Sequence, residues 1–225
     1  MRETGGVILH YLLKMMKKHY LFDFDGTLVD SMPTWSGAHI KALEDGGIPV
    51  PENFVETITP LGNYWGSKYT IDLGLEISLE DYLDRLSKYL YGEYTTRIML
   101  KPNVEAFLKK LQREGVALHV LTASPHLYVD PCLQRLGVYD YFENVWTVDD
   151  FQRTKDQPEI YQEAAERLGA VVGDCTMVDD NFTAISTAQK AGMKTLAVYD
   201  ATSKGSEAAL REVADCYLYD FKELL

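Results

Sequence analysis

Cysteine and basic residues are both scarce in this chain of 225 residues. Its three cysteines, Cys132, Cys175 and Cys216, are widely spaced and form no Cys-x-x-Cys pair, which argues against a disulfide framework or a zinc site and favours the reducing cytoplasm. Lys and Arg total 22 against 34 Asp and Glu, for a net charge of −12. Because this charge repels nucleic acid and anionic membranes, neither is expected as a partner.

Long hydrophobic runs are missing as well. The apolar stretch at residues 7–16 is interrupted by His10 and Lys14, and no small-residue cleavage site follows it, so we expect neither a signal peptide nor a membrane helix. Residues 1–16 precede the first strand pattern and are expected to form an N-terminal extension outside the fold. The remaining chain is ample for a packed core, since 46% of all residues are hydrophobic.

An apolar run that ends in two carboxylates organises the chain. Residues 20–22 predict a buried strand of a parallel sheet, and Asp23, Asp25 and Gly26 follow directly. Alternation sends the two carboxylates to the same side, where they repel each other unless a cation or a shared proton intervenes. A hard divalent ion, most simply Mg²⁺, would neutralise them. The alternative is a polar Asp-Gly turn that only closes the strand.

Residues 32–100 have a helical pattern without another strand as apolar as the first. Ser78 is expected to cap a helix whose apolar stripe is formed by Leu79, Leu83, Leu86 and Leu90. We call residues 32–100 the helical insert and expect an all-helical cap domain there. The core domain is expected to comprise residues 17–31 and 101–225.

From residue 101 onward, strand and helix patterns alternate. This rhythm predicts an α/β fold with a doubly wound parallel sheet, similar to a Rossmann core. The expected helices are 104–114, 131–136, 158–168 and 182–191, and the expected strands are 116–121, 145–147, 175–178, 195–198 and 216–218.

Three further segments place polar groups beside strands or helices. Thr122, Ala123 and Ser124 follow the second core strand, where a hydroxyl can bond a phosphoryl oxygen or simply cap the next helix. Lys155 precedes a helix, where a lone lysine normally faces solvent. In the last segment, two adjacent acids, Asp179 and Asp180, follow an apolar strand. They are either metal ligands or part of a solvated turn.

Taken in order, these segments resemble the four motifs of the haloacid dehalogenase superfamily, in the branch that contains phosphoglycolate phosphatase and β-phosphoglucomutase. The matching segments are residues 23–27, 121–124, 155–161 and 177–181, with a helical insert between the first two. One departure is Asp156, which stands where the family has a proline.

The resemblance implies a site and a reaction. Its catalytic residues would be Asp23, Asp25, Thr122 and Lys155, and its metal residues Asp23, Asp25, Asp180 and, through water, Asp179. Its phosphate ester would contact Gly26, Thr27, Ala123 and Ser124. From the insert, Trp65 and Lys68 are expected to select the substrate. They lie in a segment, residues 59–69, that is equally well interpreted as a loop between helices.

The function that follows is a Mg²⁺-dependent phosphatase for a small phosphorylated metabolite, acting through an aspartyl phosphate on Asp23. A sugar-phosphate mutase is the alternative, but such mutases have a histidine at the position that Trp35 holds here. A binding scaffold without catalysis is a third possibility, opposed by the intact motifs. The enzyme is expected to be a monomer or a weak homodimer.

Overall fold

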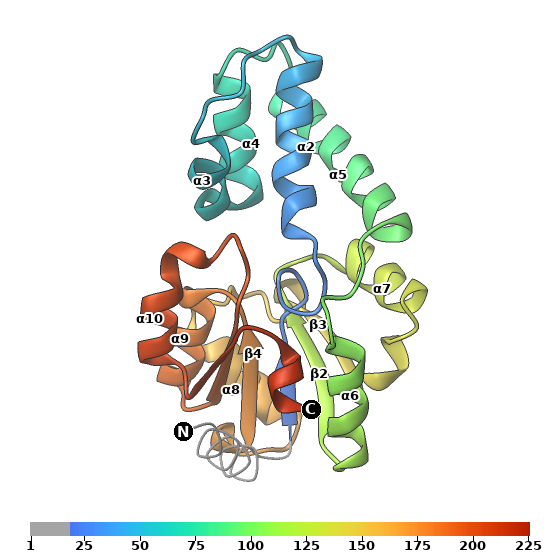
Figure 1. The fold of residues 1–225 in the computed structure, drawn as a ribbon, viewed down its shortest axis with the longest axis vertical. Coiled ribbons are helices and arrows are strands. Elements are labelled where there is room, and N and C mark those ends of the chain that lie inside the picture. The colour runs from blue at the N-terminus through green and yellow to red at the C-terminus, as the bar shows by residue number, and fades with distance from the viewer. Residues whose placement is uncertain (1–18) are drawn as a thin grey trace.

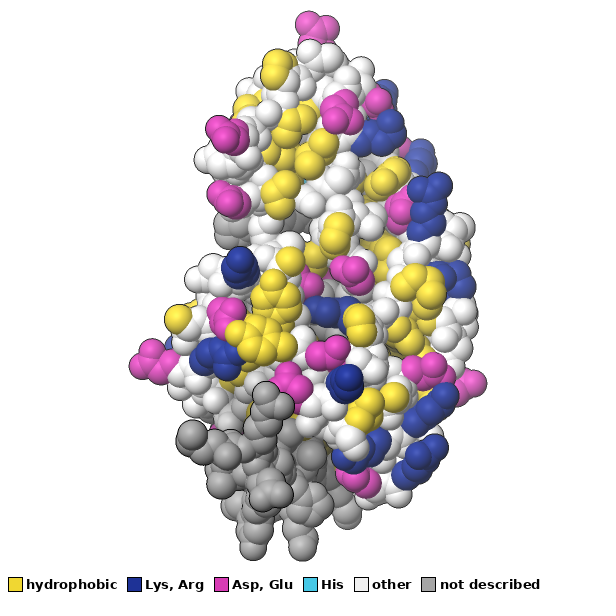
Figure 2. Space-filling model, viewed as in Figure 1, with side chains coloured by type: hydrophobic (Ala, Val, Ile, Leu, Met, Phe, Trp, Pro, Cys, Tyr) yellow, Lys and Arg dark blue, Asp and Glu magenta, His cyan; other side chains and the backbone are white. Residues whose placement is uncertain are grey.

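The computed structural model describes residues 19–225, so the expected extension at residues 1–16 lies outside the described residues. A sheet flanked by helices forms the lower part of the molecule in Figure 1, and the helical insert stands above it. None of the helices in the described chain has the length and apolar character needed to cross a bilayer. On the face drawn in Figure 2, acidic and basic side chains are interspersed.

Six parallel strands form the sheet, in the order β3-β2-β1-β4-β5-β6. Their bounds are β1 His19–Phe22, β2 Ala117–Thr122, β3 Asn144–Thr147, β4 Cys175–Asp179, β5 Lys194–Val198 and β6 Cys216–Leu218. The first strand is central, because His19 pairs with Ala117 on one side and with Cys175 on the other.

Helices cover both faces of the sheet, and the alternation along β1 shows how. Tyr20 and Phe22 pack in one hydrophobic cluster with Phe107, whereas Leu21 packs in another with Ile160. A doubly wound sheet buries its strands on both faces in this way, so the α/β fold class is confirmed.

The core helices are α6 Val104–Arg113, α7 His126–Arg135, α8 Pro158–Arg167, α9 Phe182–Ala191 and α10 Glu207–Val213. Short 3₁₀ turns are η1 Thr59–Leu61, η2 Tyr139–Tyr141, η3 Val148–Asp150, η4 Val172–Asp174, η5 Lys204–Ser206 and η6 Phe221–Leu224.

The insert contains α2 Met32–Asp45, α3 Phe54–Ile58, α4 Gly62–Asp72 and α5 Leu79–Thr96. It has a small hydrophobic cluster of its own around Leu43, Phe54 and Ile58. Its two connections to the sheet run side by side, since the Asp30 amide donates to the Met99 carbonyl at 3.0 Å. The division into a core and a cap domain at residues 32–100 remains a prediction.

The buried stripe of α5 differs from the expected one. Ser78 caps the helix, accepting a hydrogen bond from the Asp81 amide at 3.1 Å. The fully buried side chains are Tyr82, Leu86, Leu90 and Tyr94, whereas Leu79 and Leu83 are only half-buried. Counting leucines alone missed the two tyrosines, which extend the same helical face at both ends.

The alternative interpretation of residues 59–69 as a loop and the expected start of one core helix were both wrong. Residues 59–69 are not a loop, because η1 and the first turns of α4 occupy them. The helix expected at 131–136 begins five residues earlier at His126, with Pro131 inside it. A proline inside a helix costs about 3 kcal/mol. Burial of Val129, Cys132 and Leu133 on the same helix outweighs that cost.

Candidate active site

Neighbouring strands bring the first carboxylates together. Asp23 follows β1 and Asp179 ends β4, and these two strands pair with Phe22 opposite Val178. The Asp23 amide donates to the Val178 carbonyl at 2.8 Å, which extends the pairing by one step. Because the strands are parallel, their carboxyl ends meet at one edge of the sheet, where ligands of such folds collect.

Asp23, Asp179 and Asp180 form a buried acidic cluster. Each offers one carboxylate oxygen, and these three oxygens lie within 4.8 Å of one another. Burial raises the pKa of Asp180 well above its ordinary value, and the charges of Asp179 and Asp23 add to the rise. Three mutually repelling oxygens at this spacing suit a hard divalent cation, which takes oxygen ligands and removes the repulsion.

Lys155 supplies the positive charge of the site. Its Nζ donates to Asp23 Oδ1 at 2.5 Å and to Asp179 Oδ2 at 2.8 Å. Burial by itself would lower the pKa of Lys155, but the charges of Asp179 and Asp23 outweigh burial and raise it. Asp156 does not displace this lysine, since the Tyr161 hydroxyl holds the Lys155 carbonyl at 2.9 Å.

Gly26 allows the first motif to turn beneath Asp180. Its φ is +74°, and a Cβ built there would lie 2.7 Å from Asp180 Oδ1. A side chain therefore fits neither the backbone conformation nor the space. Thr27 follows and donates its hydroxyl to Asp180 Oδ1 at 3.2 Å, so both residues of the turn contact the space or the oxygen of this carboxylate.

Asp25 is held by hydroxyl groups and not by the acidic cluster. Its carboxylate accepts hydrogen bonds from the hydroxyls of Ser31, Tyr94 and Ser124, the first at 2.5 Å. Burial raises the pKa of Asp25, and the charge of Asp23 adds to the rise. Among the described residues, the acidic cluster does not include the Asp25 carboxylate, so the expectation that it ligates a metal stays a prediction.

The segment after β2 forms another wall of the site. Thr122 Oγ1 accepts a hydrogen bond from the Ser124 amide at 3.1 Å, which fixes the turn. Thr122, Ala123 and Ser124 all line the cavity that contains Asp23 and Asp25. The structure therefore brings the segment expected to bind phosphate next to the carboxylates.

Trp65 and Lys68, by contrast, do not line this cavity. Trp65 is 59% exposed, and Lys68 Nζ lies over its ring at 5.2 Å from the centroid. Their place in the cavity wall is taken by Thr59, Gly62 and Asn63, slightly earlier in the same segment. The helical turn of this segment directs the two expected residues elsewhere.

Several residues of the site were missed by sequence reasoning. Tyr94 and His39 reach it from the helical insert, and a periodic pattern identifies such residues only as buried. Lys101 is a third: its Nζ donates to the carbonyls of Gly26 and Tyr199 and to Asp200 Oδ2, at 2.6, 2.7 and 3.0 Å. Nothing in the sequence around Lys101, which directly precedes Pro102, indicates that this lysine is buried.

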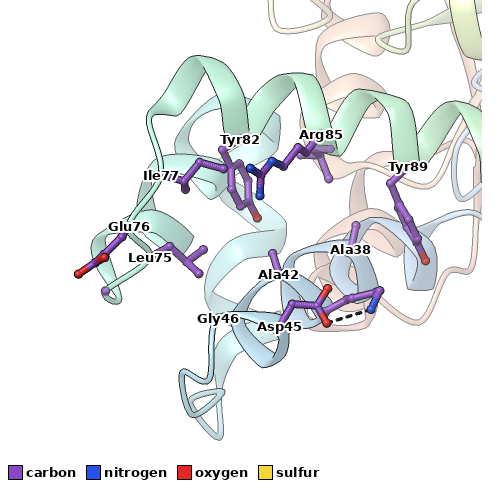
Figure 3. A pocket seen from close by; sticks show the side chains of 13 residues that line it. Ala38, Ala42, Asp45, Gly46, Leu75, Glu76, Ile77, Tyr82, Arg85 and Tyr89 are labelled. Carbon is purple, nitrogen blue, oxygen red and sulfur yellow. Dashed lines mark hydrogen bonds and ion pairs between the residues drawn. The ribbon is translucent and has the colours of Figure 1, made fainter.

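A second cavity of similar size lies elsewhere in the described part of the chain, and it lacks this chemistry. The cavity with the carboxylates measures about 520 Å³. The other, about 540 Å³, lies within the insert between α2, α5 and residues 74–77 (Figure 3). Lys41 and Asp45, both in its lining, form an ion pair at 3.1 Å. Arg85 and Tyr89 extend from α5 (Figure 3). It lacks a cluster of carboxylates around a buried lysine, so we assign the active site to the first.

Comparison with known proteins agrees with this geometry. The chain is 30% identical over 196 residues to a phosphoglycolate phosphatase of Psychrobacter arcticus, covering 81% of this chain and 83% of that protein. It is 25% identical over 175 residues to a phosphorylated carbohydrates phosphatase of Thermotoga maritima, covering 77% and 81%. A solved structure described as a predicted phosphoglycolate phosphatase from Haemophilus somnus superposes with a TM-score of 0.76 at 25% identity, covering 93% and 96%.

The family model for haloacid dehalogenase-like hydrolases matches residues 17–192. The matched residues make up most of the chain and contain all the site residues from Asp23 to Asp180. The protein therefore belongs to the haloacid dehalogenase-like hydrolase family.

Proposed function

We propose that the chain is a Mg²⁺-dependent phosphatase that hydrolyses a small phosphorylated metabolite through an aspartyl phosphate on Asp23. The observation that carries the proposal is the acidic cluster of Asp23, Asp179 and Asp180 with Lys155 bonded to two of its members. The family membership and the relatives named as phosphatases support it.

In the first half of the reaction, a carboxylate oxygen of Asp23 attacks phosphorus. The new bond joins this oxygen to phosphorus, and the bond between phosphorus and the ester oxygen breaks. Asp25 gives its proton to the leaving oxygen, a role that suits a carboxyl whose pKa is raised by burial. Both side chains line one cavity, so one bound ester can meet the two of them.

In the second half, Asp25 takes a proton from water, whose oxygen attacks phosphorus and releases the Asp23 carboxylate. Lys155 stabilises the charge on Asp23 and on the phosphoryl oxygens throughout. Thr122 lines the same cavity, and its hydroxyl would donate a hydrogen bond to those oxygens. The acidic cluster would hold Mg²⁺, which would supply positive charge to the transferring phosphoryl group.

The mutase alternative is not favoured. Trp35 stands where sugar mutases of the family have a histidine, and its Nε1 donates to the Tyr94 hydroxyl at 2.7 Å. The indole N–H of Trp35 therefore holds Tyr94, which in turn donates a hydrogen bond to Asp25. It does not transfer a proton to or from the substrate as a histidine could. Transfer to water requires no further group from the chain.

The test uses the purified full chain and p-nitrophenyl phosphate. We expect hydrolysis that requires Mg²⁺ and is removed by a chelator, and no turnover by Asp23→Asn, which keeps the side-chain size but loses the nucleophile. Asp84→Asn is the matched control, because Asp84 is exposed on α5, where it pairs with Lys88 on the same helix. Wild-type turnover by a folded Asp23→Asn protein would overturn the proposal.

A further inference from the structure

The helical insert supplies the part of the cavity wall that faces the alcohol side of a bound ester. From this side come Trp35 and His39 on α2, Ile58 at the end of α3, and Thr59 and Asn63 around the start of α4. The phosphoryl group belongs at the opposite wall, beside Asp23 and Lys155. With the phosphoryl group at that wall, the insert residues therefore contact the alcohol portion of the ester.

This wall has no positive charge. Among the described residues that line the cavity, Lys155 is the single Lys or Arg, and its ammonium is already bonded to Asp23 and Asp179. Four aspartates line the same cavity. A second anionic group on the alcohol would thus meet an insert wall that offers no cation to pair with, so the cost of taking that group out of water would not be compensated there.

His39 does not supply the missing charge. It is 4% exposed, and burial lowers its pKa to about 4, so the ring is neutral at physiological pH. Its Nδ1 lies 2.8 Å from the Tyr82 hydroxyl and 3.1 Å from Thr70 Oγ1. Nε2 has no hydrogen-bond partner among the described residues, and His39 lines the cavity.

The other insert residues add uncharged polar groups and apolar surface. Asn63 offers an amide and Thr59 a hydroxyl, while Trp35 packs edge to face against Tyr128 with centroids 6.4 Å apart. Amide, hydroxyl and imidazole groups bond substrate hydroxyls, and aromatic faces cover carbon frameworks. The volume of about 520 Å³ is also within the range of pockets that hold ligands much larger than a two-carbon ester.

We propose that His39 and Asn63 form an uncharged recognition wall that selects phosphate monoesters of neutral, polyhydroxylated alcohols and rejects esters whose alcohol carries a carboxylate. This inference rests on the proposed phosphatase function and adds the substrate class to it. It also replaces Trp65 and Lys68 as the residues that decide specificity.

A matched pair of substrates isolates the charge. 2-Phosphoglycolate and 2-hydroxyethyl phosphate are two-carbon esters that differ by a carboxylate against a hydroxymethyl group. We expect kcat/KM for 2-hydroxyethyl phosphate to exceed that for 2-phosphoglycolate by at least about tenfold, and sorbitol 6-phosphate to be better still. Equal or higher kcat/KM for 2-phosphoglycolate would overturn the inference while leaving the phosphatase intact. Failure to hydrolyse any ester, p-nitrophenyl phosphate included, would instead overturn the proposed function.

A charge placed in the wall provides the second test. Asn63 is exposed near the start of α4, so Asn63→Lys tests the wall with little effect on folding. We expect this variant to raise kcat/KM for 2-phosphoglycolate relative to 2-hydroxyethyl phosphate by about tenfold. Asn53→Lys adds the same charge at an exposed position outside the cavity and should leave the ratio unchanged. The same ratio in both variants would show that the wall does not contact the alcohol.

Discussion

The hydroxyl of Tyr94 on α5 donates a hydrogen bond to the carboxylate of Asp25 in the loop after β1. The same hydroxyl accepts the Nε1 proton of Trp35 at 2.7 Å, and the ring stacks on Tyr128 with centroids 5.1 Å apart. Tyr94 is fully buried. The helical insert therefore contacts the proposed acid and base directly, through one side chain whose position is fixed on several sides.

Removal of this hydroxyl should impair catalysis. Tyr94→Phe keeps the ring but deprives Asp25 of a donor and Trp35 of an acceptor, so we expect kcat/KM to fall about tenfold, equivalent to ~1.4 kcal/mol. Steady-state kinetics on p-nitrophenyl phosphate measures the effect. Tyr91→Phe is the control, because Tyr91 lies on the same helix and is 44% exposed. Equal kinetics in the two variants would contradict a role for Tyr94.

A methyl group at Gly26 should disturb Asp180. Gly26→Ala imposes a left-handed backbone cost of about 1–2 kcal/mol and a contact that Asp180 can relieve only by moving. We expect lower stability in urea and a higher Mg²⁺ concentration for half-maximal activity. Gly47→Ala is the matched control, since its φ is +69° with no atom within 4 Å of a Cβ. It should show the stability loss alone; altered Mg²⁺ activation in both variants would refute the explanation.

The two adjacent aspartates should differ in how they affect metal activation. Asp179 accepts bonds from Lys155 and from the Asn181 amide, whereas Asp180 accepts one from Thr27 and has more oxygen free for a cation. We expect Asp180→Ala to raise the Mg²⁺ requirement by more than about 100-fold, and Asp179→Ala by about 10–100-fold. Activity titrated against Mg²⁺ measures both effects. The reverse order would mean that their roles are exchanged.

His126 should make stability depend on pH without affecting catalysis. Burial would lower its pKa, but hydrogen bonds to Asp130 and Asp150 outweigh burial and raise it. A raised pKa in the folded state stabilises below the unfolded value of about 6.5, and this stabilisation is lost as the pH rises through the folded pKa. Because all three side chains are partly exposed to solvent, which screens their charges, the contribution should be below about 1 kcal/mol.

Urea unfolding of wild type and His126→Gln from pH 5 upward tests this expectation. The two free energies of unfolding should differ most at pH 5 and converge above neutrality. Turnover of p-nitrophenyl phosphate should be the same in both proteins. A difference that grows with pH would show that His126 is stabilised in its neutral form.

The acidic cluster and the sheet could be predicted because their signals are local. Asp23 and Asp179 follow apolar strands directly, and the parallel sheet alone places such strand ends together. Lys155 is found where the motif indicated, despite the aspartate at position 156. The carboxylates required only the alternation of strands and helices and the identity of the residues at each strand end, whereas Lys155 was indicated by the family resemblance alone.

The contribution of the insert could not be predicted in the same way. Periodicity indicates which face of a helix is buried, but Tyr94 and His39 meet the site because of how whole helices pack on the sheet. Trp65 and Lys68 were selected for their chemistry in a segment that the sequence describes equally well as a loop between helices. In the helix that forms there, the cavity is instead lined by Gly62 and Asn63.

The central position of β1 has a consequence for how the protein is made. This strand precedes every other strand of the sheet on the ribosome, yet its two neighbours begin only at Ala117 and Cys175. Until the second of them emerges, one edge of β1 is unpaired, and Asp179 and Asp180 have not been synthesised. Strand pairing over such distances is slow and exposes apolar surface meanwhile. Any nascent or truncated chain that ends before Cys175 thus combines an open sheet edge with a site that lacks two of its three clustered carboxylates.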